Sequence, residues 1–200
     1  MKKIQLSVLI CLLGTLTVQA QTALRIGAQL QAAGQEIEDT SGRTWTLEQK
    51  KDTNGLLVIF SSNTCPWVAK WEDRYNFIST LANINDVGMI VLNPNERIRS
   101  RGESLDDMRR RAQKQGYNFT YALDEDHIIA DAFGATRTPE VFLFDGNSIL
   151  VYHGAIDDNA DDANSTQKNF LEDALNAIAN GEDIPIQQSK LSGCGIKRSE

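Results

Sequence analysis

Residues 56–67 read LLVIFSSNTCPW. The run from Leu56 to Phe60 is continuously apolar and of strand length, which is typical of a central strand covered on both faces. Pro66 suits the first turn of a helix, so Cys65 is expected where a buried strand passes into a helix. The helix dipole and free backbone N–H groups there favour the thiolate. The stretch predicts a nucleophilic cysteine, with a buried, inert cysteine as the alternative.

Strand and helix patterns alternate on both sides of this stretch. Apolar residues at spacings of three and four predict one helix running from Pro66 to Leu81. The alternation predicts an α/β fold, with a central mixed β-sheet flanked by helices on both faces. The other expected elements are a hairpin over 36–47, strands over 87–92, 141–144 and 148–153, and helices over 104–115, 124–133 and 167–179.

The first twenty residues have the pattern of a cleaved signal peptide. Lys2 and Lys3 precede a short apolar run, and Val18-Gln19-Ala20 places compact residues before a cut. The mature chain is therefore expected to start at Gln21 and to have no membrane span. The expected organisation is a signal peptide over 1–20, one domain over 21–181, and an extended tail over 182–200 that carries Cys194.

The charge of the chain excludes some functions. Loss of Lys2 and Lys3 moves the formal net charge from -7 to -9, and an acidic chain without a basic patch is not expected to bind nucleic acid. The segment 96–111 mixes arginines with carboxylates, which favours a solvated helix face. The only histidines, His127 and His153, lie in different elements, so neither a metal site nor another cofactor is expected.

A second signal lies at Thr138-Pro139-Glu140, just before a predicted buried strand. Proline is a poor opener for a central strand, and a cis peptide bond in a tight turn would explain it. Cys65-Pro66 after one strand and Thr138-Pro139 before another resemble the thioredoxin superfamily, most closely its periplasmic redoxin or AhpC/TSA-like branch. The resemblance covers about residues 24–181. It implies a thioredoxin-like fold in which Thr138 and Pro139 form a ledge that docks a substrate segment beside Cys65.

The sequence also departs from this family. Val68 stands where a thioredoxin has its second cysteine, and Ile59 stands where it has a buried acid. Glu140 is the nearest replacement for that acid by position, with a solvent-facing carboxylate as the alternative. Trp67 is expected either to line the substrate surface or to cover the edge of the sheet.

Peroxiredoxins resemble the Cys65 stretch in a different way. They carry Thr or Ser three residues before the cysteine, and Ser62 meets this requirement. Val58 occupies the place of their proline, and Arg137 is the nearest counterpart of their arginine, with an ordinary surface arginine as the alternative.

Cys194 needs a separate explanation, because Cys11 leaves with the signal peptide. Gly193 and Gly195 flank it and suggest a mobile segment. A resolving cysteine, which closes a bond to Cys65, needs such a segment. A permanent structural disulfide and an unpaired or intermolecular thiol are the alternatives.

Together these features predict an exported thiol–disulfide oxidoreductase, periplasmic if the source is Gram-negative. Its expected partners are a protein or small-molecule disulfide and an external thiol reductant. One alternative is a peroxiredoxin-like peroxidase acting on hydroperoxides, and another is a non-catalytic module that binds a client on the proline ledge. The sequence leaves the oligomeric state open.

Overall fold

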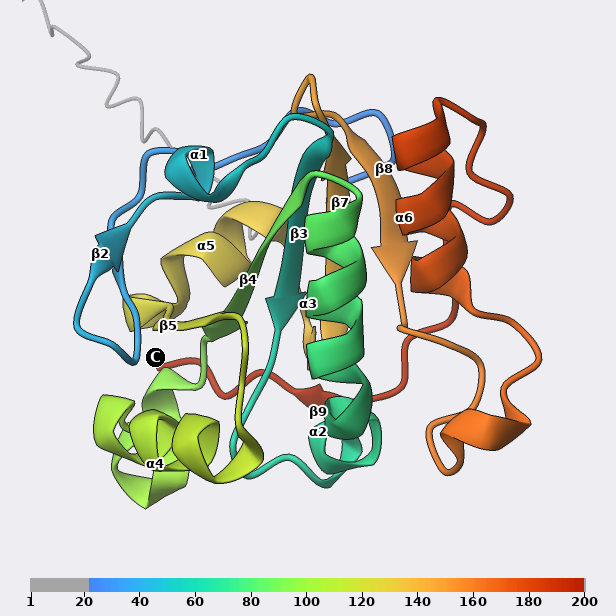
Figure 1. Cartoon of the computed structure of the whole chain (residues 1–200). Coiled ribbons are helices and arrows are strands. Elements are labelled where there is room, and N and C mark those ends of the chain that lie inside the picture. Colours follow the sequence, from blue (N-terminus) through green and yellow to red (C-terminus); the bar gives the residue numbers. More distant parts are fainter. Residues whose placement is uncertain (1–21, 200) are drawn as a thin grey trace, which may run out of the picture.

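The computed structural model describes residues 22–199, so the expected signal peptide lies outside the described part of the chain. A five-stranded mixed sheet forms the centre, in the order β5-β4-β3-β7-β8 (Figure 1). β3, β4 and β5 are parallel, and β7 and β8 are antiparallel to their neighbours. The strands are β3 (Gly55–Phe60), β4 (Val87–Asn93), β5 (Thr120–Leu123), β7 (Glu140–Asp145) and β8 (Leu150–Gly154).

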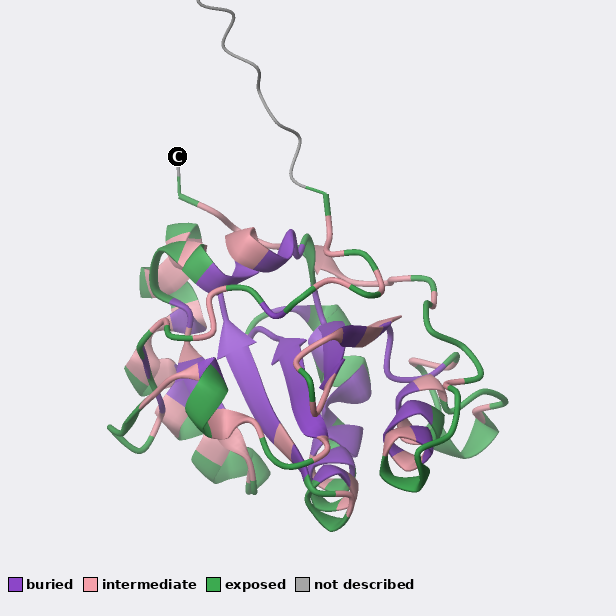
Figure 2. Cartoon of the chain, turned by 90° about the horizontal axis from the view of Figure 1, so that it is seen from above, coloured by how far each residue is buried: buried purple, intermediate pink, exposed green. Residues whose placement is uncertain are grey.

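Helices cover both faces of this sheet, as the alternating pattern predicts. Odd and even residues of β3 enter different clusters, because successive side chains of a strand point to opposite faces. Figure 2 shows the buried strands enclosed by helices and loops that are exposed on their outer sides. The covering helices are α2 (Pro66–Trp71), α3 (Tyr75–Ile84) and α6 (Phe170–Asn180) on one face and α5 (Ile128–Phe133) on the other.

The smaller elements complete the domain. The predicted hairpin is present as β1 (Ile37–Glu38) and β2 (Thr44–Trp45), and Thr46 caps the short helix α1 (Leu47–Lys50) that follows. Ser104 caps α4 (Leu105–Gln115), which ends at Gly116 in the left-handed conformation that favours glycine. The remaining turns are η2 (Glu96–Ile98), η3 (Arg99–Glu103), η4 (Glu125–His127) and η5 (Ala163–Ser165).

One expected helix is broken, and one strand was not predicted. The helix after Cys65 is not continuous, because η1 (Glu72–Arg74) separates α2 from α3. Glu72 binds Arg111 of α4, and Arg74 pairs with Asp157, so long-range ion pairs hold this break. β5, a strand of four residues at the edge of the sheet, was not predicted from the sequence.

The C-terminal segment contains β9 (Cys194–Gly195), which pairs with β6 (Arg137–Thr138). Figure 1 shows this red segment crossing the end of the sheet beside α2. Within residues 22–199, no helix is long and apolar enough to cross a membrane.

Candidate thiol-redox site

Cys65 lies where β3 has ended and α2 begins, as predicted. Its side chain is buried, with 6% exposed, and belongs to the apolar cluster that contains Val68 and Trp71. The Cys65 backbone N–H donates to Ser62 Oγ over 3.2 Å. The core and the preceding loop therefore fix the position of this cysteine.

Glu103 organises that loop and is fully buried, although its charge-rich segment was predicted to be a solvated face. The Ser62 hydroxyl donates to Glu103 Oε1 over 2.5 Å, and the Asn63 N–H donates to Oε2 over 2.9 Å. Thr64 donates through its N–H and its hydroxyl, and the Asn93 side-chain amide donates over 2.6 Å. One carboxylate from η3 thus replaces the hydrogen bonds to water that the loop loses on burial.

Asn93 links Glu103 to the sheet. It ends β4, and its side-chain amide also donates to the Tyr121 hydroxyl over 3.3 Å. Tyr121 donates in turn to Asn63 Oδ1 over 2.9 Å. Burial, and then the charge of Glu103, raises the pKa of Tyr121 well above its ordinary value, so this hydroxyl stays a neutral donor. Sequence reasoning missed this network, whose one local signal is an asparagine at the end of a buried strand.

The predicted proline ledge faces Cys65. The Thr138–Pro139 peptide bond is cis, as predicted, and both residues are buried. The Cys65 Sγ lies 3.2 Å from the Thr138 carbonyl oxygen. β3, α2 and the ledge before β7 therefore meet at one sulfur.

Glu140 contacts the residues that precede the ledge and does not face solvent. It is fully buried, and its Oε2 accepts hydrogen bonds from the N–H groups of Thr136 and Arg137, each over 2.8 Å. Its Oε1 lies 2.8 Å from Nε2 of His153 on β8. One oxygen is bound by the residues just before the ledge and the other by β8, so these contacts indicate a positioning role.

The tail brings Cys194 to Cys65. The two cysteines form a disulfide across a sequence separation of 129, with Cα atoms 6.1 Å apart. β9 pairs antiparallel with β6, so Cys194 lies opposite Thr138 and Gly195 lies opposite Arg137. The tail therefore occupies the strand edge beside the cis proline.

This tail is anchored on both sides of Cys194, whereas the flanking glycines suggested a mobile segment. Before the cysteine, Ser189 Oγ accepts from the Ala155 N–H over 2.8 Å. After it, the Lys197 N–H donates to Asn95 Oδ1 over 2.9 Å. Arg198 reaches Asp131 Oδ1 over 2.7 Å and the Ala135 carbonyl over 2.6 Å.

Three other predicted site residues lie near the disulfide and differ in their exposure and contacts. Pro66 is the first residue of α2, and Trp67 after it is 37% exposed, with Lys70 Nζ 4.9 Å from its ring centre. Arg137 is exposed, and its guanidinium donates to the Gly193 carbonyl over 3.0 Å. Its contact is with the tail.

The loop after β8 carries a buried carboxylate. Asp157 stands in a polar, acidic run of the sequence, yet it is buried, with 5% exposed. It accepts from Trp71 Nε1 over 3.0 Å and pairs with Arg74 Nε over 2.7 Å. This pair ties the loop to α2 and η1 behind the cysteine.

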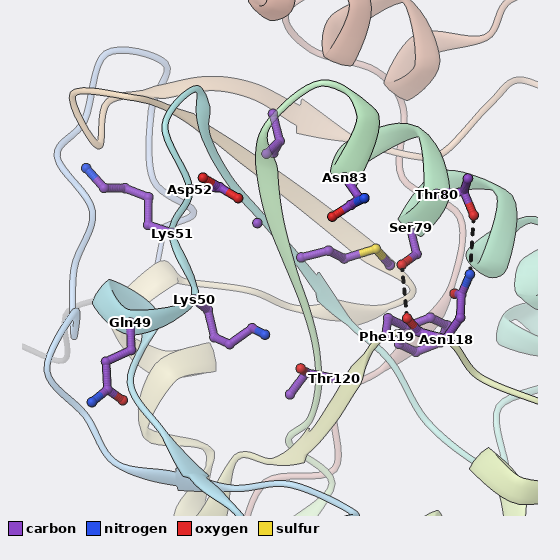
Figure 3. A pocket seen from close by; sticks show the side chains of 13 residues that line it. Gln49, Lys50, Lys51, Asp52, Ser79, Thr80, Asn83, Asn118, Phe119 and Thr120 are labelled. Atoms are coloured by element: carbon purple, nitrogen blue, oxygen red, sulfur yellow. Dashed lines mark hydrogen bonds between the residues drawn. The ribbon is translucent and has the colours of Figure 1, made fainter.

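A hollow of about 720 Å³ lies at the other end of the sheet, away from Cys65 (Figure 3). It is lined by residues before β3, at the start of β4 and in α3, such as Lys50, Gly88 and Ser79. None of the predicted site residues lines it. Within residues 22–199, no group of three or more His, Cys, Asp or Glu side chains is placed to hold a metal ion.

A thioredoxin-like sheet with a strand–cysteine–proline–helix junction facing a cis proline defines the thioredoxin superfamily of thiol-redox proteins. The chain belongs to the Redoxin family, whose model matches residues 25–171. This membership supports a thiol-based redox function. Comparison with curated proteins gave no match.

Solved structures agree with this assignment. A hypothetical protein from Sinorhizobium meliloti 1021 is 28% identical, with a TM-score of 0.81 over 89% of this chain and 97% of that one. An uncharacterised conserved protein from Geobacillus kaustophilus is 25% identical, with a TM-score of 0.81 over 88% and 93%. A peroxidoxin from Mycobacterium tuberculosis, 11% identical with a TM-score of 0.60 over 79% and 97%, shares the fold.

Proposed function

We propose that the protein is an exported thiol–disulfide oxidoreductase, with Cys65 as its nucleophile and Cys194 as its resolving cysteine. One observation carries the proposal: Cys194 is bonded to Cys65 while its strand lies on the edge beside the cis Pro139. An extended client segment can pair with that same edge as an added strand. Client and tail would then take turns at the ledge.

The chemistry balances without a cofactor. In the reduced protein, the Cys65 thiolate attacks a client disulfide, a Cys65–client bond forms, and the client's other sulfur leaves as a thiolate. Cys194 then attacks Cys65, the Cys65–Cys194 bond forms, and the client's remaining sulfur leaves. The client gains two electrons, which the two cysteines lose. An external thiol restores the dithiol.

Two contacts favour this reaction over the reduction of hydroperoxides. A bound hydroperoxide would need donors aimed at its oxygens. The Ser62 hydroxyl already donates its only proton to Glu103, and the Arg137 guanidinium donates to the Gly193 carbonyl. Both side chains that could support a peroxidase are therefore engaged by other groups.

The test compares a disulfide with a peroxide as oxidant of the reduced protein, followed by the fluorescence of Trp67. We expect a peptide disulfide to oxidise the wild type, Cys194→Ser to stop at a Cys65–peptide adduct seen by mass spectrometry, and Cys65→Ser not to react. Hydrogen peroxide should react no faster than with an ordinary thiolate. A peroxide rate orders of magnitude higher would establish the peroxidase instead. Client binding by Cys65→Ser, with no exchange by the wild type, would establish the binding module.

Export has its own support and its own test. Lys2 and Lys3, the apolar run over residues 6–16 and the compact residues Val18 and Ala20 before the cut form the pattern of a signal peptide. In a Gram-negative host, the full chain should appear in the periplasm with Gln21 as its first residue. Intact mass and fractionation decide this, and a cytoplasmic protein that still begins at Met1 would refute export.

A further inference from the structure

The tail that follows Cys194 is held along its length. β9 pairs with β6, and Figure 1 shows the segment running on from β9 across the end of the sheet. The Ile196 N–H donates to the Thr136 carbonyl over 3.0 Å. The Lys197 carbonyl accepts from the Arg97 N–H over 2.9 Å. These bonds join main-chain groups, so they can position an extended segment of any sequence.

Two side chains of this segment have binding sites of their own. Ile196 is partly buried against the apolar cluster that contains Ala135. The Arg198 guanidinium donates to Asp131 Oδ1 over 2.7 Å and to the Ala135 carbonyl over 2.6 Å. The residues two and four positions after Cys194 are therefore bound through their side chains.

The surroundings of Arg198 are negatively charged. Asp131 is partly buried in α5, and its Oδ2 lies 2.8 Å from Nδ1 of His127. Glu125 and Asp126, in η4 just before α5, are exposed carboxylates. A cation is favoured at this place, whereas a carboxylate there would meet charges of its own sign.

A client that replaces the tail has to cross the same ground. Its reactive cysteine must reach Cys65 and therefore takes the place of Cys194 on the edge of β6. An extended chain advances about 3.3 Å per residue, so the second and fourth residues after that cysteine arrive where Ile196 and Arg198 now lie. The first residue after it is not selected, because a Cβ at Gly195 would meet no atom within 4 Å.

We infer that the protein selects clients with an aliphatic residue two positions after the reactive cysteine and an arginine four positions after it; this rests on the proposed function. Asp131 and the Ala135 carbonyl bind the arginine, and the cluster under Ile196 binds the aliphatic side chain. The exchange is unchanged: a Cys65–client bond forms, and the client's other sulfur leaves as a thiolate. The selection is made by α5 and the residues that follow it, outside the cis-proline ledge.

The test uses the reduced full-length Cys194→Ser variant and synthetic peptides whose one cysteine carries a 2-thiopyridyl group. The parent peptide copies the tail on both sides of Cys194. When Cys65 attacks the peptide sulfur, pyridine-2-thione leaves, and its absorbance gives the rate. The variant's own tail competes equally with every peptide, so the ratios of the rates are compared.

We expect the parent peptide to react fastest. Peptides with Arg198→Glu or Ile196→Ser should react about tenfold more slowly, because each loses a side-chain contact with the protein. A peptide with Gly195→Ala should keep the parent rate. Equal rates for all four peptides would overturn this inference and leave the proposed function standing. If no ordinary peptide disulfide oxidises the wild type, the proposed function fails, and this inference fails with it.

Charge reversal at Asp131 tests the binding site itself. In Asp131→Lys, made in the Cys194→Ser background, the Arg198→Glu peptide should react faster than the parent peptide. Both peptides meet the same variant, so a general loss of activity cancels in the ratio of their rates. Asp131→Asn, which keeps the shape of the side chain, covers the case in which the reversal does not fold, and it should weaken the preference for arginine.

Asp173→Lys is the matched control, because it makes the same change of charge at an exposed residue of α6. It should keep the full preference for the parent peptide. An undiminished preference for arginine in the Asp131 variants would overturn the inference.

Discussion

The loop that holds Cys65 and the tail that holds Cys194 meet at one bond but are built differently. Glu103, a single buried carboxylate, fixes the loop with hydrogen bonds to three successive residues, Ser62 to Thr64. The tail is laid on the surface and is held by separate contacts on each side of Cys194, at Ser189 and at Arg198. The difference indicates that folding of the domain fixes the position of Cys65, whereas Cys194 reaches it only when the tail docks. The tail can undock by local unfolding while the domain stays folded.

The largest effect is expected from removing the bond between these two regions. Cys194→Ser opens a closure of 129 residues, which should lower the free energy of unfolding by about 4 to 5 kcal/mol because the unfolded chain regains entropy. Urea unfolding of the oxidised wild type and of the variant measures the difference. The reduced wild type is the control and should match the variant. A loss below about 1 kcal/mol would mean that the bond adds little to the tail contacts.

Glu103→Ala tests the Cys65 side of the comparison. It leaves several buried donors of the loop and of Asn93 without an acceptor, so we expect a loss of about 3 kcal/mol in unfolding free energy. Glu125→Ala is the control, because Glu125 is exposed in η4 and its loss should change stability by less than about 0.5 kcal/mol. Equal losses in the two variants would show that the loop does not depend on Glu103.

Asp124 supports α5, the helix to which the tail is anchored after Cys194. It accepts hydrogen bonds from the N–H groups of Ile129 and Ala130 in α5, the helix that also carries Asp131, the partner of Arg198. Burial raises the pKa of Asp124 from 3.8 to about 6. The folded state therefore binds the proton of the Asp124 carboxyl group more tightly than the unfolded state does. The stability that this proton contributes is complete below pH 3.8 and is lost as the pH rises through about 6.

Relative to Asp124→Asn, which does not titrate, the wild type should lose about 2 kcal/mol of unfolding free energy across this window. Urea unfolding of both proteins between pH 4 and 7 gives the difference, in which the other carboxylates cancel. A difference that is independent of pH would show that folding does not raise the pKa of Asp124.

Local patterns were enough to predict the centre of the fold and one half of the site. Neighbouring residues carry both signals: the apolar run before Cys65, and Pro139 directly before a buried strand. The strand and the cis peptide bond are confirmed. β5 was missed because its four residues, Thr120–Leu123, lie at the edge of the sheet and are too few to show a clear period.

The other half of the site depends on contacts that no local pattern encodes. Glu103 stands among charged residues that predict a solvated face, yet it is buried and accepts hydrogen bonds from Ser62, 41 positions away, and from Asn93. Glycines beside Cys194 suggested mobility, but the register that places Cys194 opposite Thr138 joins residues 56 positions apart. Pairing of that kind depends on where the rest of the chain places the two strand edges.

The smallest effect is expected from substituting the glycines that flank Cys194. The comparison of Gly193→Ala with Gly195→Ala tests whether docking of the tail sets the reduction potential of the disulfide. A Cβ at Gly193 would lie 2.6 Å from the Thr138 carbonyl oxygen, whereas a Cβ at Gly195 would meet no atom within 4 Å. Overpacking of this kind costs about 1 to 3 kcal/mol, and Gly193→Ala places that strain on the docked, oxidised tail. The equilibrium constant for reduction of the disulfide should then rise about tenfold, which raises its reduction potential by about 30 mV.

Equilibration with glutathione buffers measures this shift, and Gly195→Ala should keep the wild-type value. Equal potentials in the two variants would show that the ledge does not constrain the tail, and the bond alone would then hold Cys194 at Cys65.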